Sequence, residues 1–360
     1  MIPLVRAASS DAERTYVTRL RVASDAIGVD DSVLVDGDEE GAAFAGRHGM
    51  LAIEGLTPAA LDGDVVVVDP LQGRVERLLR ADSGHNTLLV TERCDQLCVM
   101  CSQPPKKTHD DRFDLFEAAC LLAPEGALIG VSGGEPTLYK DRLLTMLERV
   151  LAARPDLGFH VLTNGQHFED ADVERLGSPI YRGVSWGIPL YAADPGLHDL
   201  IVGKDGAFPR LEASLARLAT AGARIELRTV VLADNAESLP KLSRFVSARL
   251  RFVEAWSIMQ LEHIGFAKGR WATLFVDHRG CFEPIAAALD HALLHGVRAQ
   301  LFNFPRCTVP LAYRDLAIAS ISDWKQKYAP ACGDCRERER CSGFFEWHPD
   351  EEARMAVTPL

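Results

Sequence analysis

Short apolar runs rich in β-branched residues alternate with amphipathic stretches along the middle of the chain. The amphipathic stretches, such as DRLLTMLERVLAARP (141–155) and FPRLEASLARLATAG (208–222), carry apolar residues at three- and four-residue spacing, as helices do. The apolar runs predict strands at 87–92, 127–133, 158–165, 181–189, 224–232 and 252–260. Six strand–helix repeats predict an α/β fold with a parallel sheet, and favour a partial (β/α)6 TIM-like barrel over a complete eight-repeat barrel.

The first 84 residues have a different texture, with short alternating runs broken by Gly and Asp. The segment GDVVVVDPLQGRVERLLR (63–80) predicts a hairpin around DPLQG (69–73). We expect a small, mostly β N-terminal module at 1–84, the partial barrel at 85–298 and a cysteine-rich extension at 299–360. The strand content suggests that the module offers an edge strand to a peptide by β-augmentation.

Composition narrows the class of protein. The 360 residues are 47% hydrophobic and 25% charged, as in soluble globular proteins, and the net charge of −12 argues against a broad nucleic-acid interface. The first residues lack the pattern of a signal peptide, and no apolar run approaches the length of a membrane span. We therefore expect a cytoplasmic protein with neither nucleic acid nor membrane as partner. Nine cysteines in that compartment favour metal binding or catalysis over disulfides.

Three cysteines lie just after the first predicted strand, in TERCDQLCVMCSQPPKK (91–107). Cys94, Cys98 and Cys101 offer three thiolates from one loop, which suits an iron–sulfur cluster with one open iron. The spacing alone leaves two alternatives. His85 or His109 could complete a zinc site, or two of the cysteines could form a redox pair.

A second motif, SGGEP (132–136), follows the second predicted strand. Gly133 and Gly134 let the backbone approach another group closely. The Glu135 carboxylate or a backbone carbonyl can accept a hydrogen bond from an ammonium group, and Pro136 fixes the exit of the turn.

The Cx3Cx2C loop followed by a GGE motif one repeat later resembles the radical SAM superfamily. The resemblance implies a 4Fe–4S cluster on Cys94, Cys98 and Cys101, with S-adenosylmethionine on the open iron. It also implies that Met100, at a position usually aromatic, lies beside adenine. Further implied cofactor contacts are Gly133, Gly134, Glu135, Pro136, Thr163, Asn164, Ser185 and Arg228. Strand-end capping for Asn164 and Ser185, and a buried ion pair for Arg228, remain alternatives.

A second cysteine group occupies the C-terminal extension. These four residues could close a zinc site or hold a second cluster, and they are Cys307, Cys332, Cys335 and Cys341. The Cx2Cx5C run resembles the start of a SPASM motif, with Phe345 at the place of the next cysteine. The resemblance implies a shortened, twitch-like extension with one auxiliary 4Fe–4S cluster. Cys120 and Cys281 stand alone and are expected to be small buried side chains.

Four phrases in order resemble, more finely, the His-Xaa-Ser system radical SAM maturases of the HxsC type. They are TERC…CVMCSQPPK, SGGEPTL, LEHIGFAKGR and SISDWKQKY…PACGDCRERERCSGFF. This implies a precursor peptide as substrate, a possible second radical SAM maturase as partner and an external electron donor. The reaction implied is reductive cleavage of S-adenosylmethionine to a 5′-deoxyadenosyl radical that abstracts hydrogen from the peptide.

Other readings stay open from the sequence. The substrate could be a small metabolite or an RNA base, or the chain could be a non-catalytic iron–sulfur or zinc scaffold that binds a partner. No catalytic side chain is identified. Glu262 and His263, after the sixth predicted strand, could face substrate or solvent.

Overall fold

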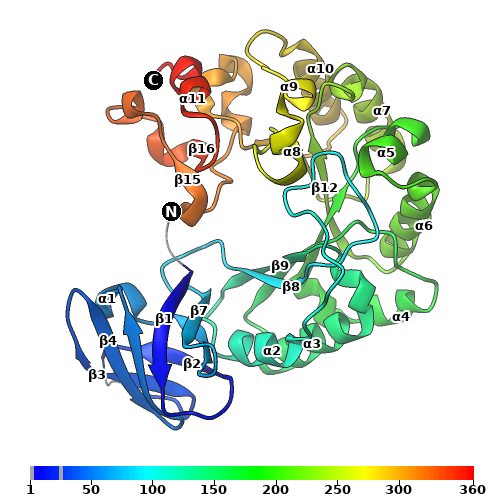
Figure 1. Ribbon diagram of the computed structural model, residues 1–360. Helices are drawn as coiled ribbons and strands as arrows, with labels where there is room; N and C mark the ends of the chain where they lie inside the picture. The colour runs from blue at the N-terminus through cyan, green and yellow to red at the C-terminus, as the bar shows by residue number, and fades with distance from the viewer. Residues whose placement is uncertain (1–3, 24–26) are drawn as a thin grey trace.

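The computed structural model describes residues 4–23 and 27–360 and has three parts (Figure 1). An N-terminal β-barrel is followed by a curved parallel sheet with helices on its outer face. A C-terminal extension of short elements then returns along the inner side of the molecule, above the barrel in the view of Figure 1. The predicted fold class is confirmed by this arrangement.

Seven strands close the N-terminal barrel in the order β1-β5-β4-β3-β2-β6-β7, with β1 paired to β7. The predicted hairpin is present, since Asp69 pairs with Arg74 across the turn. Leu20, Phe44 and Leu51 are fully buried among the residues that fill the barrel. The elements are β1 (Val5–Ser10), β2 (Tyr16–Arg21), β3 (Asp31–Gly37), β4 (Gly41–Gly46), β5 (Gly49–Glu54), α1 (Pro58–Leu61), β6 (Val65–Asp69) and β7 (Arg74–Leu79).

Closure corrects the expectation of an edge strand in this module. Among the strands within residues 4–23 and 27–79, each has two neighbours, so none offers a free edge to a peptide. Barrel closure is the arrangement that removes edges altogether. The expectation that this module offers an edge strand to a peptide by β-augmentation was therefore wrong.

The parallel sheet follows chain order, β14-β13-β12-β11-β10-β9-β8, and six of its strands fall on the six predicted runs. Alternate residues such as Phe159, Trp186 and Ile225 are fully buried under the outer helices, while the intervening residues face the concave side. The strands are β8 (Thr87–Thr91), β9 (Leu128–Gly133), β10 (Gly158–Leu162), β11 (Val184–Pro189), β12 (Arg224–Val230), β13 (Ala255–Met259) and β14 (Ala299–Phe302).

The outer helices bury the apolar stripes that their spacing predicts. In α6, for example, Leu211, Leu215 and Leu218 are buried, and the chain turns at Gly222, whose φ is 70°. The helices of the sheet domain are α2 (Phe113–Leu121), α3 (Lys140–Ala153), α4 (Asp172–Leu176), α5 (Pro195–Val202), α6 (Ala207–Thr220), α7 (Leu239–Arg249), α8 (Gly265–Gly269), α9 (Trp271–Leu274) and α10 (Glu283–Leu294). Short 3-10 helices are η1 (Pro136–Tyr139), η2 (Pro179–Gly183) and η3 (Ala236–Ser238).

The barrel and the sheet share one hydrophobic core through α2. Val17, Val67 and Leu79, on the outer surface of the barrel, belong to the same buried cluster as Phe113 and Phe116 of α2. The barrel is thus packed against the sheet domain rather than tethered to it.

The C-terminal extension begins at a strand that the sequence pattern did not identify. β14 pairs in parallel with β13, as in the pair Ser257 and Gln300, and is the seventh strand of the sheet. A buried Arg80 joins the base of the barrel to this extension, since it donates to Asp323 at 2.7 Å. The remaining elements are η4 (Arg306–Thr308), η5 (Leu311–Leu316), η6 (Asp323–Lys325), β15 (Gln326–Lys327), η7 (Pro330–Cys332), η8 (Arg338–Arg340), β16 (Phe344–Phe345) and α11 (Asp350–Ala356).

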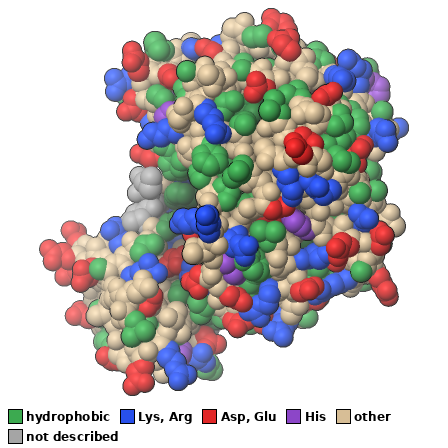
Figure 2. Space-filling view, turned by 45° about the vertical axis from the view of Figure 1, so that its right-hand side comes forward, with side chains coloured by type: hydrophobic (Ala, Val, Ile, Leu, Met, Phe, Trp, Pro, Cys, Tyr) green, Lys and Arg blue, Asp and Glu red, His purple; other side chains and the backbone are tan. Residues whose placement is uncertain are grey.

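Two general features of the described residues complete the fold. Figure 2 shows acidic and basic side chains interspersed over one face of the molecule, with a notch between the lower lobe and the rest. No helix within residues 4–23 and 27–360 has the length and apolar character that a membrane crossing would require.

Candidate functional site

The Cx3Cx2C loop and the SGGEP turn lie together at the carboxyl edge of the parallel sheet. Gly134 N–H donates to the Thr91 carbonyl at 2.8 Å, and Glu135 N–H donates to the Arg93 carbonyl at 2.7 Å. A Cβ added to Gly134 would lie 2.2 Å from the Arg93 oxygen. The glycines are therefore required because the two segments run backbone to backbone, as the sequence predicts for Gly133 and Gly134.

The far side of the cysteine loop is held by the end of α5. Leu97 N–H donates to the Val202 carbonyl at 3.1 Å, and Val99 N–H donates to the Ile201 carbonyl at 2.9 Å. Gly203 ends the helix with φ of 64°, and a Cβ there would lie 2.5 Å from the Leu97 oxygen. Only a glycine C-cap lets the loop approach so closely.

The segment around α8 holds the third side of the loop. Phe266 N–H donates to the Cys101 carbonyl at 2.9 Å, and Arg270 donates to the Val99 carbonyl at 2.8 Å. The loop therefore contacts the ends of β9, α5 and the segment after β13. Three parts of the chain fix where the thiols lie.

The three thiols are half-buried and close enough to influence one another. Burial, with a smaller contribution from the neighbouring Cys101, raises the pKa of Cys94 and of Cys98 to about 12. Burial also raises the pKa of Cys101. A bound metal centre would supply the positive charge that three adjacent thiolates need. The donor set therefore fits a cluster held by three thiolates.

A site for a single metal ion, such as zinc, needs several ligand side chains that converge on one point. Among the residues that the structure describes, no three His, Cys, Asp or Glu side chains are arranged to hold one metal ion. An iron–sulfur cluster spreads its ligands over different iron atoms. Of the two histidines considered as zinc ligands, His85 is exposed and His109 stacks on Tyr139 at 3.7 Å between ring centroids.

Glu135 behaves differently from the expected ligand contact. Its side chain is 0% exposed, and its carboxylate accepts from Thr137 N–H at 2.8 Å, Thr163 Oγ1 at 2.6 Å, Asn164 N–H at 2.5 Å and the Thr137 hydroxyl. The carboxylate therefore joins the turn after β9 to the turn after β10. Of the two acceptors that the sequence offered for an ammonium group, only a backbone carbonyl remains open. Pro136 is the first residue of η1, as an exit-fixing proline should be.

Asp95, inside the cysteine loop, is a residue that the sequence reasoning missed. Its carboxylate accepts from Asn164 Nδ2 at 2.8 Å and pairs with His167 at 3.3 Å and with Lys204. Burial alone would raise the pKa of Asp95, but the hydrogen bonds from His167 and Lys204 hold it well below its ordinary value. Asn164 and Thr163 are thus both engaged in hydrogen bonds that brace the loop.

Three other expected cofactor contacts have the following places. Met100 is 6% exposed and packs in a buried cluster with Tyr191 and Ile201, behind the loop. Ser185 is the second residue of β11, so it lies toward the amino end of its strand and away from the cysteines. Arg228 lies on the concave face and pairs with Glu226 at 3.1 Å, which is the ion pair left open as an alternative.

A polar network that the sequence reasoning missed lines the concave face of the sheet. His160 Nε2 of β10 lies 2.8 Å from Glu226 of β12, and it reaches across Gly187 of β11, where a Cβ would lie 2.9 Å from that nitrogen. Ser257 also donates to Glu226, and Gln300 donates to Ser257 at 3.0 Å. Burial alone would raise the pKa of Glu226, but the hydrogen bond from His160 helps to lower it to about 2. The sequence does contain a signal for this network, because polar residues stand at alternate positions of strands that are otherwise apolar.

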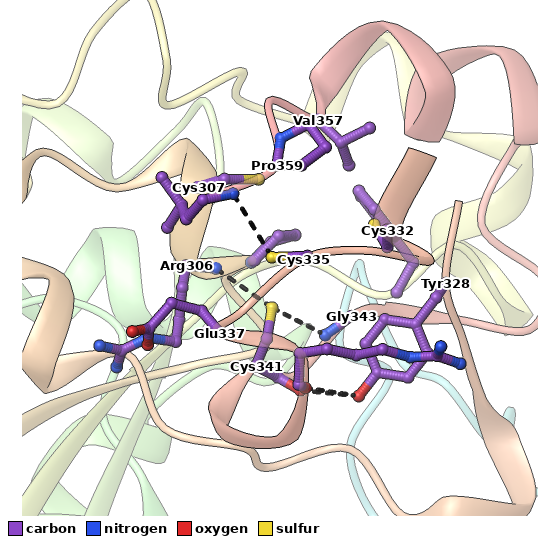
Figure 3. A pocket seen from close by; sticks show the side chains of 14 residues that line it. Arg306, Cys307, Tyr328, Cys332, Cys335, Glu337, Cys341, Gly343, Val357 and Pro359 are labelled. Carbon is purple, nitrogen blue, oxygen red and sulfur yellow. Dashed lines mark hydrogen bonds and ion pairs between the residues drawn. The ribbon is translucent and has the colours of Figure 1, made fainter. Parts of the chain in front are cut away.

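The four C-terminal cysteines line one pocket of about 370 Å³, including its open mouth (Figure 3). Cys307 comes from η4, directly after the sheet, and joins Cys332, Cys335 and Cys341 from the extension. Burial raises the pKa of Cys307, and the other three thiols raise it further. Four mutually interacting thiols in one pocket fit a cluster with four protein ligands.

Backbone N–H groups point at two of these sulfurs. Cys341 Sγ accepts from Arg306 N–H at 3.3 Å and from Gly343 N–H at 3.4 Å, and Cys335 Sγ accepts from Leu360 N–H at 3.5 Å. Hydrogen bonds of this kind tune the properties of iron–sulfur sites. Phe345, at the place of the absent SPASM cysteine, is buried in β16.

The remaining candidates also have definite surroundings. His263 lies 3.1 Å from the Trp347 carbonyl. Burial raises the pKa of Glu262, while Lys325 and Trp347 of the extension act to lower it, so both side chains face the C-terminal extension. Cys120 is fully buried, as predicted. Cys281 is only half-buried, with its thiol 3.9 Å from Glu237, so the expectation of a buried side chain was wrong there.

Comparisons with known proteins extend the description. No protein-family model matches the sequence, and no curated protein matches it. Among solved structures, native anSMEcpe with bound AdoMet is 15% identical, with a TM-score of 0.50 over 60% of this chain and 63% of that one. Streptococcus suis SuiB bound to S-adenosylmethionine is 15% identical, with a TM-score of 0.48 over 60% of this chain and 49% of SuiB.

A third match covers more of the chain. A radical SAM methyltransferase from Sphaerobacter thermophilus is 15% identical, with a TM-score of 0.45 over 75% of this chain and 76% of that one. The matched region spans about half the length of SuiB and less than two thirds of anSMEcpe. At these identities the likeness is one of fold. The chain has an α/β fold in which the parallel sheet and its outer helices form a core similar in fold to anSMEcpe, beside an N-terminal seven-stranded barrel.

Proposed function

We propose that the chain is a radical S-adenosylmethionine enzyme that modifies a peptide. One observation carries the proposal: the three-cysteine loop and the glycine turn are hydrogen-bonded to each other at the carboxyl edge of the sheet. That edge is where parallel α/β folds place their chemistry. The likeness in fold to anSMEcpe, whose structure holds bound AdoMet, supports the proposal.

Cys94, Cys98 and Cys101 would hold a 4Fe–4S cluster. When bound, this cluster supplies the electron that cleaves S-adenosylmethionine into methionine and a 5′-deoxyadenosyl radical. The chain's own part is to bind and orient the cofactor. A backbone carbonyl of the 132–136 turn would accept from the methionine ammonium, because the Glu135 carboxylate is already filled by the chain's own donors.

Other residues support the site in different ways. Arg228, on the concave face, would bind the methionine carboxylate in addition to its ion pair with Glu226. Thr163 and Asn164 act by positioning the loop through Glu135 and Asp95. Met100 would support the loop from behind rather than touch adenine. Ser185 is the weakest of the proposed contacts, because it lies near the amino end of β11.

Cys307, Cys332, Cys335 and Cys341 would hold one auxiliary 4Fe–4S cluster. Their shared pocket and the N–H donors to Cys335 and Cys341 support four protein ligands rather than three. Phe345 stands where a SPASM motif has its next cysteine, and the absence of that thiol supports a single auxiliary cluster. The auxiliary cluster would either accept an electron from the product or hold the substrate.

The peptide substrate rests on the sequence resemblance of the extension and of the four phrases. That resemblance points to a His-Xaa-Ser precursor peptide, a second radical SAM maturase as partner and an external electron donor. The polar network on the concave face, with Glu226 at its centre, supports a polar substrate group within the partial barrel.

The test is anaerobic reconstitution with iron and sulfide, followed by S-adenosylmethionine and dithionite. We expect 5′-deoxyadenosine from the wild-type chain, none from Cys98→Ala, and wild-type amounts from Cys281→Ala, which changes a cysteine outside both groups. Equal product from Cys98→Ala would overturn the proposal. So would a chain that binds zinc at these cysteines and takes up no iron.

A further inference from the structure

Residues 357–360, which follow α11, form one wall of the four-cysteine pocket. Val357, Pro359 and Leu360 line the pocket, and Val357 and Pro359 lie across it from Cys341 in Figure 3. Val357 leaves the helix with extended backbone, at φ −87° and ψ 137°. We call residues 357–360 the C-terminal strap, because they continue as extended chain across the thiols.

The helix before the strap is fixed to the body of the molecule. Trp271 of α9 donates to Glu352 at 3.1 Å, and Arg279 donates to the Met355 carbonyl at 2.9 Å. Ala353, on the same helix, is 3% exposed. Anchors from α9 and from the chain between α9 and α10 therefore fix where the strap begins.

Two N–H groups of the strap reach cysteine sulfurs. Leu360 N–H donates to Cys335 Sγ at 3.5 Å. Burial raises the pKa of the Cys307 thiol, and a backbone hydrogen bond from Thr358 acts to lower it. The Leu360 oxygen accepts in turn from Arg336 N–H at 2.9 Å. The strap thus contacts two of the four thiols, and the loop that carries Cys335 holds the strap in place.

The sequence of the strap, VTPL, suits this arrangement. Along an extended chain, backbone groups two residues apart point to the same side. The N–H groups of Thr358 and Leu360 therefore share one side, and the residue between them, Pro359, has no N–H. A proline also favours extended backbone at the residue before it. Both N–H groups that follow Val357 are consequently directed at sulfur.

Charged side chains near the pocket are engaged with other groups. Arg306 is 4% exposed in its side chain and pairs with Asp315 and Glu337, each at 2.9 Å. The guanidinium of Arg338 lies 4.8 Å from the centre of the Tyr328 ring. The hydrogen bonds that the structure directs at the thiols come instead from backbone N–H groups.

Hydrogen bonds to sulfur act on the reduction potential of an iron–sulfur cluster. The reduced cluster carries one more negative charge than the oxidised cluster, and hydrogen bonds to a more highly charged acceptor are stronger. N–H donors at the thiolates therefore stabilise the reduced form more than the oxidised form.

We propose that the C-terminal strap is part of the auxiliary cluster site, and that its N–H groups at Thr358 and Leu360 raise the reduction potential of that cluster. The inference rests on the proposed function for the identity of the cluster. It adds residues 357–360 to the site, as positioning residues that act through Cys307 and Cys335. The consequence is a cluster that is reduced more readily than the same four thiolates would allow without the strap.

The test measures the reduction potential of the auxiliary cluster in the full chain. Anaerobic reconstitution is carried out in a background that lacks the first cluster, with Cys94→Ala, Cys98→Ala and Cys101→Ala. A redox titration then follows the electron paramagnetic resonance signal of the reduced auxiliary cluster. Leu360→Pro removes the N–H that reaches Cys335, and Leu360→Ala is the matched control because it changes the side chain and keeps the N–H.

We expect Leu360→Pro to shift the reduction equilibrium about tenfold toward the oxidised form, as the loss of one hydrogen bond to a charged group would. For a one-electron couple this is a fall of about 59 mV. Leu360→Ala should leave the potential unchanged. Proline variants with the wild-type potential, or alanine variants that shift it as far, would overturn the inference.

A second pair of variants protects the test against misfolding. Thr358→Pro and Thr358→Ala make the same comparison at the N–H that reaches Cys307, and Thr358 is exposed, so either side chain has room. Thr358→Pro should lower the potential by a similar amount. Iron and sulfide analysis and circular dichroism show which variants keep the cluster and the fold. Loss of the cluster from folded alanine variants as well would contradict a role that depends on the N–H groups.

The two proposals fail in different ways. A chain that holds the auxiliary cluster, but whose potential is indifferent to both proline variants, overturns only the role of the strap. The proposed cluster, and this inference with it, is wrong if the chain takes up no iron at the four cysteines, which are Cys307, Cys332, Cys335 and Cys341.

Discussion

Replacing Glu135 tests whether its carboxylate stabilises the fold or binds the cofactor. The sequence motif points to an ammonium contact, whereas the structure fills this carboxylate with four donors of the chain itself. The informative variants are Glu135→Ala and Glu135→Gln. Glu92→Gln is the matched control, because Glu92 lies in the same region and pairs with the exposed Lys106 at 2.7 Å.

The expected loss of stability follows from the identity of the donors. The hydroxyls of Thr137 and Thr163 can rotate to other acceptors, but the N–H groups of Thr137 and Asn164 cannot. Each orphaned buried N–H costs about 1–3 kcal/mol, so Glu135→Ala should lower the free energy of unfolding by about 4 kcal/mol. Glu135→Gln keeps one oxygen and turns an amide N–H toward one of these donors, so about 2 kcal/mol is expected. The surface pair of Glu92 should be worth less than about 1 kcal/mol.

The assay is urea unfolding followed by circular dichroism, with S-adenosylmethionine binding measured in parallel on the reconstituted proteins. The order Ala, then Gln, then the Glu92→Gln control is expected for destabilisation. The reasoning is refuted if Glu135→Gln unfolds like the wild type while its affinity for S-adenosylmethionine falls. That result would mean that the carboxylate meets the ligand and not the chain.

Two further predictions concern other ionic contacts. Glu226 has a pKa of about 2 in the folded chain against an ordinary value of 4.5, so its stabilisation is present above pH 4.5 and lost as pH falls toward 2. This lowering corresponds to about 3 kcal/mol, and acid unfolding between these limits should be less steep for Glu226→Gln; equal slopes would contradict it. Arg80→Met removes the buried hydrogen bond to Asp323. The packing of the C-terminal extension against this part of the chain should weaken by about 2 kcal/mol as a result. Faster hydrogen exchange around Asp323 is expected, and unchanged exchange there would show that the contact is dispensable.

Much of the fold could be predicted from periodicity. The six apolar runs became six strands because β-branched segments of that length between amphipathic helices have few other stable arrangements. β14 was missed because AQLF is only four residues long and lies next to the cysteine-rich tail. The closure of the barrel was missed because strand partners, including the parallel pair of β2 and β3, leave no mark in local alternation.

The candidate site was predictable in its loops and less so in its side chains. The spacing of Cys94, Cys98 and Cys101 and the two glycines express local backbone requirements, which a sequence records directly. Whether Glu135 meets a ligand depends on hydroxyls and amides about 28 residues away, which fill it before any ligand can. The His160–Glu226 contact depends on the absence of a side chain at Gly187, on the strand between them.

Helix α2 has a practical consequence for truncation. One side of it packs on the sheet and another on Val17, Val67 and Leu79 of the barrel. Removing residues 1–80 would leave an apolar helix face open to water, and exposed patches of this kind drive aggregation. A shortened chain that fails to handle a peptide would therefore report on solubility, not on recognition. Point changes on the outside of the barrel, away from α2, are the sound way to ask what the barrel does. For the same reason the barrel is unsuited to exchange between relatives as a cassette unless α2 is exchanged with it.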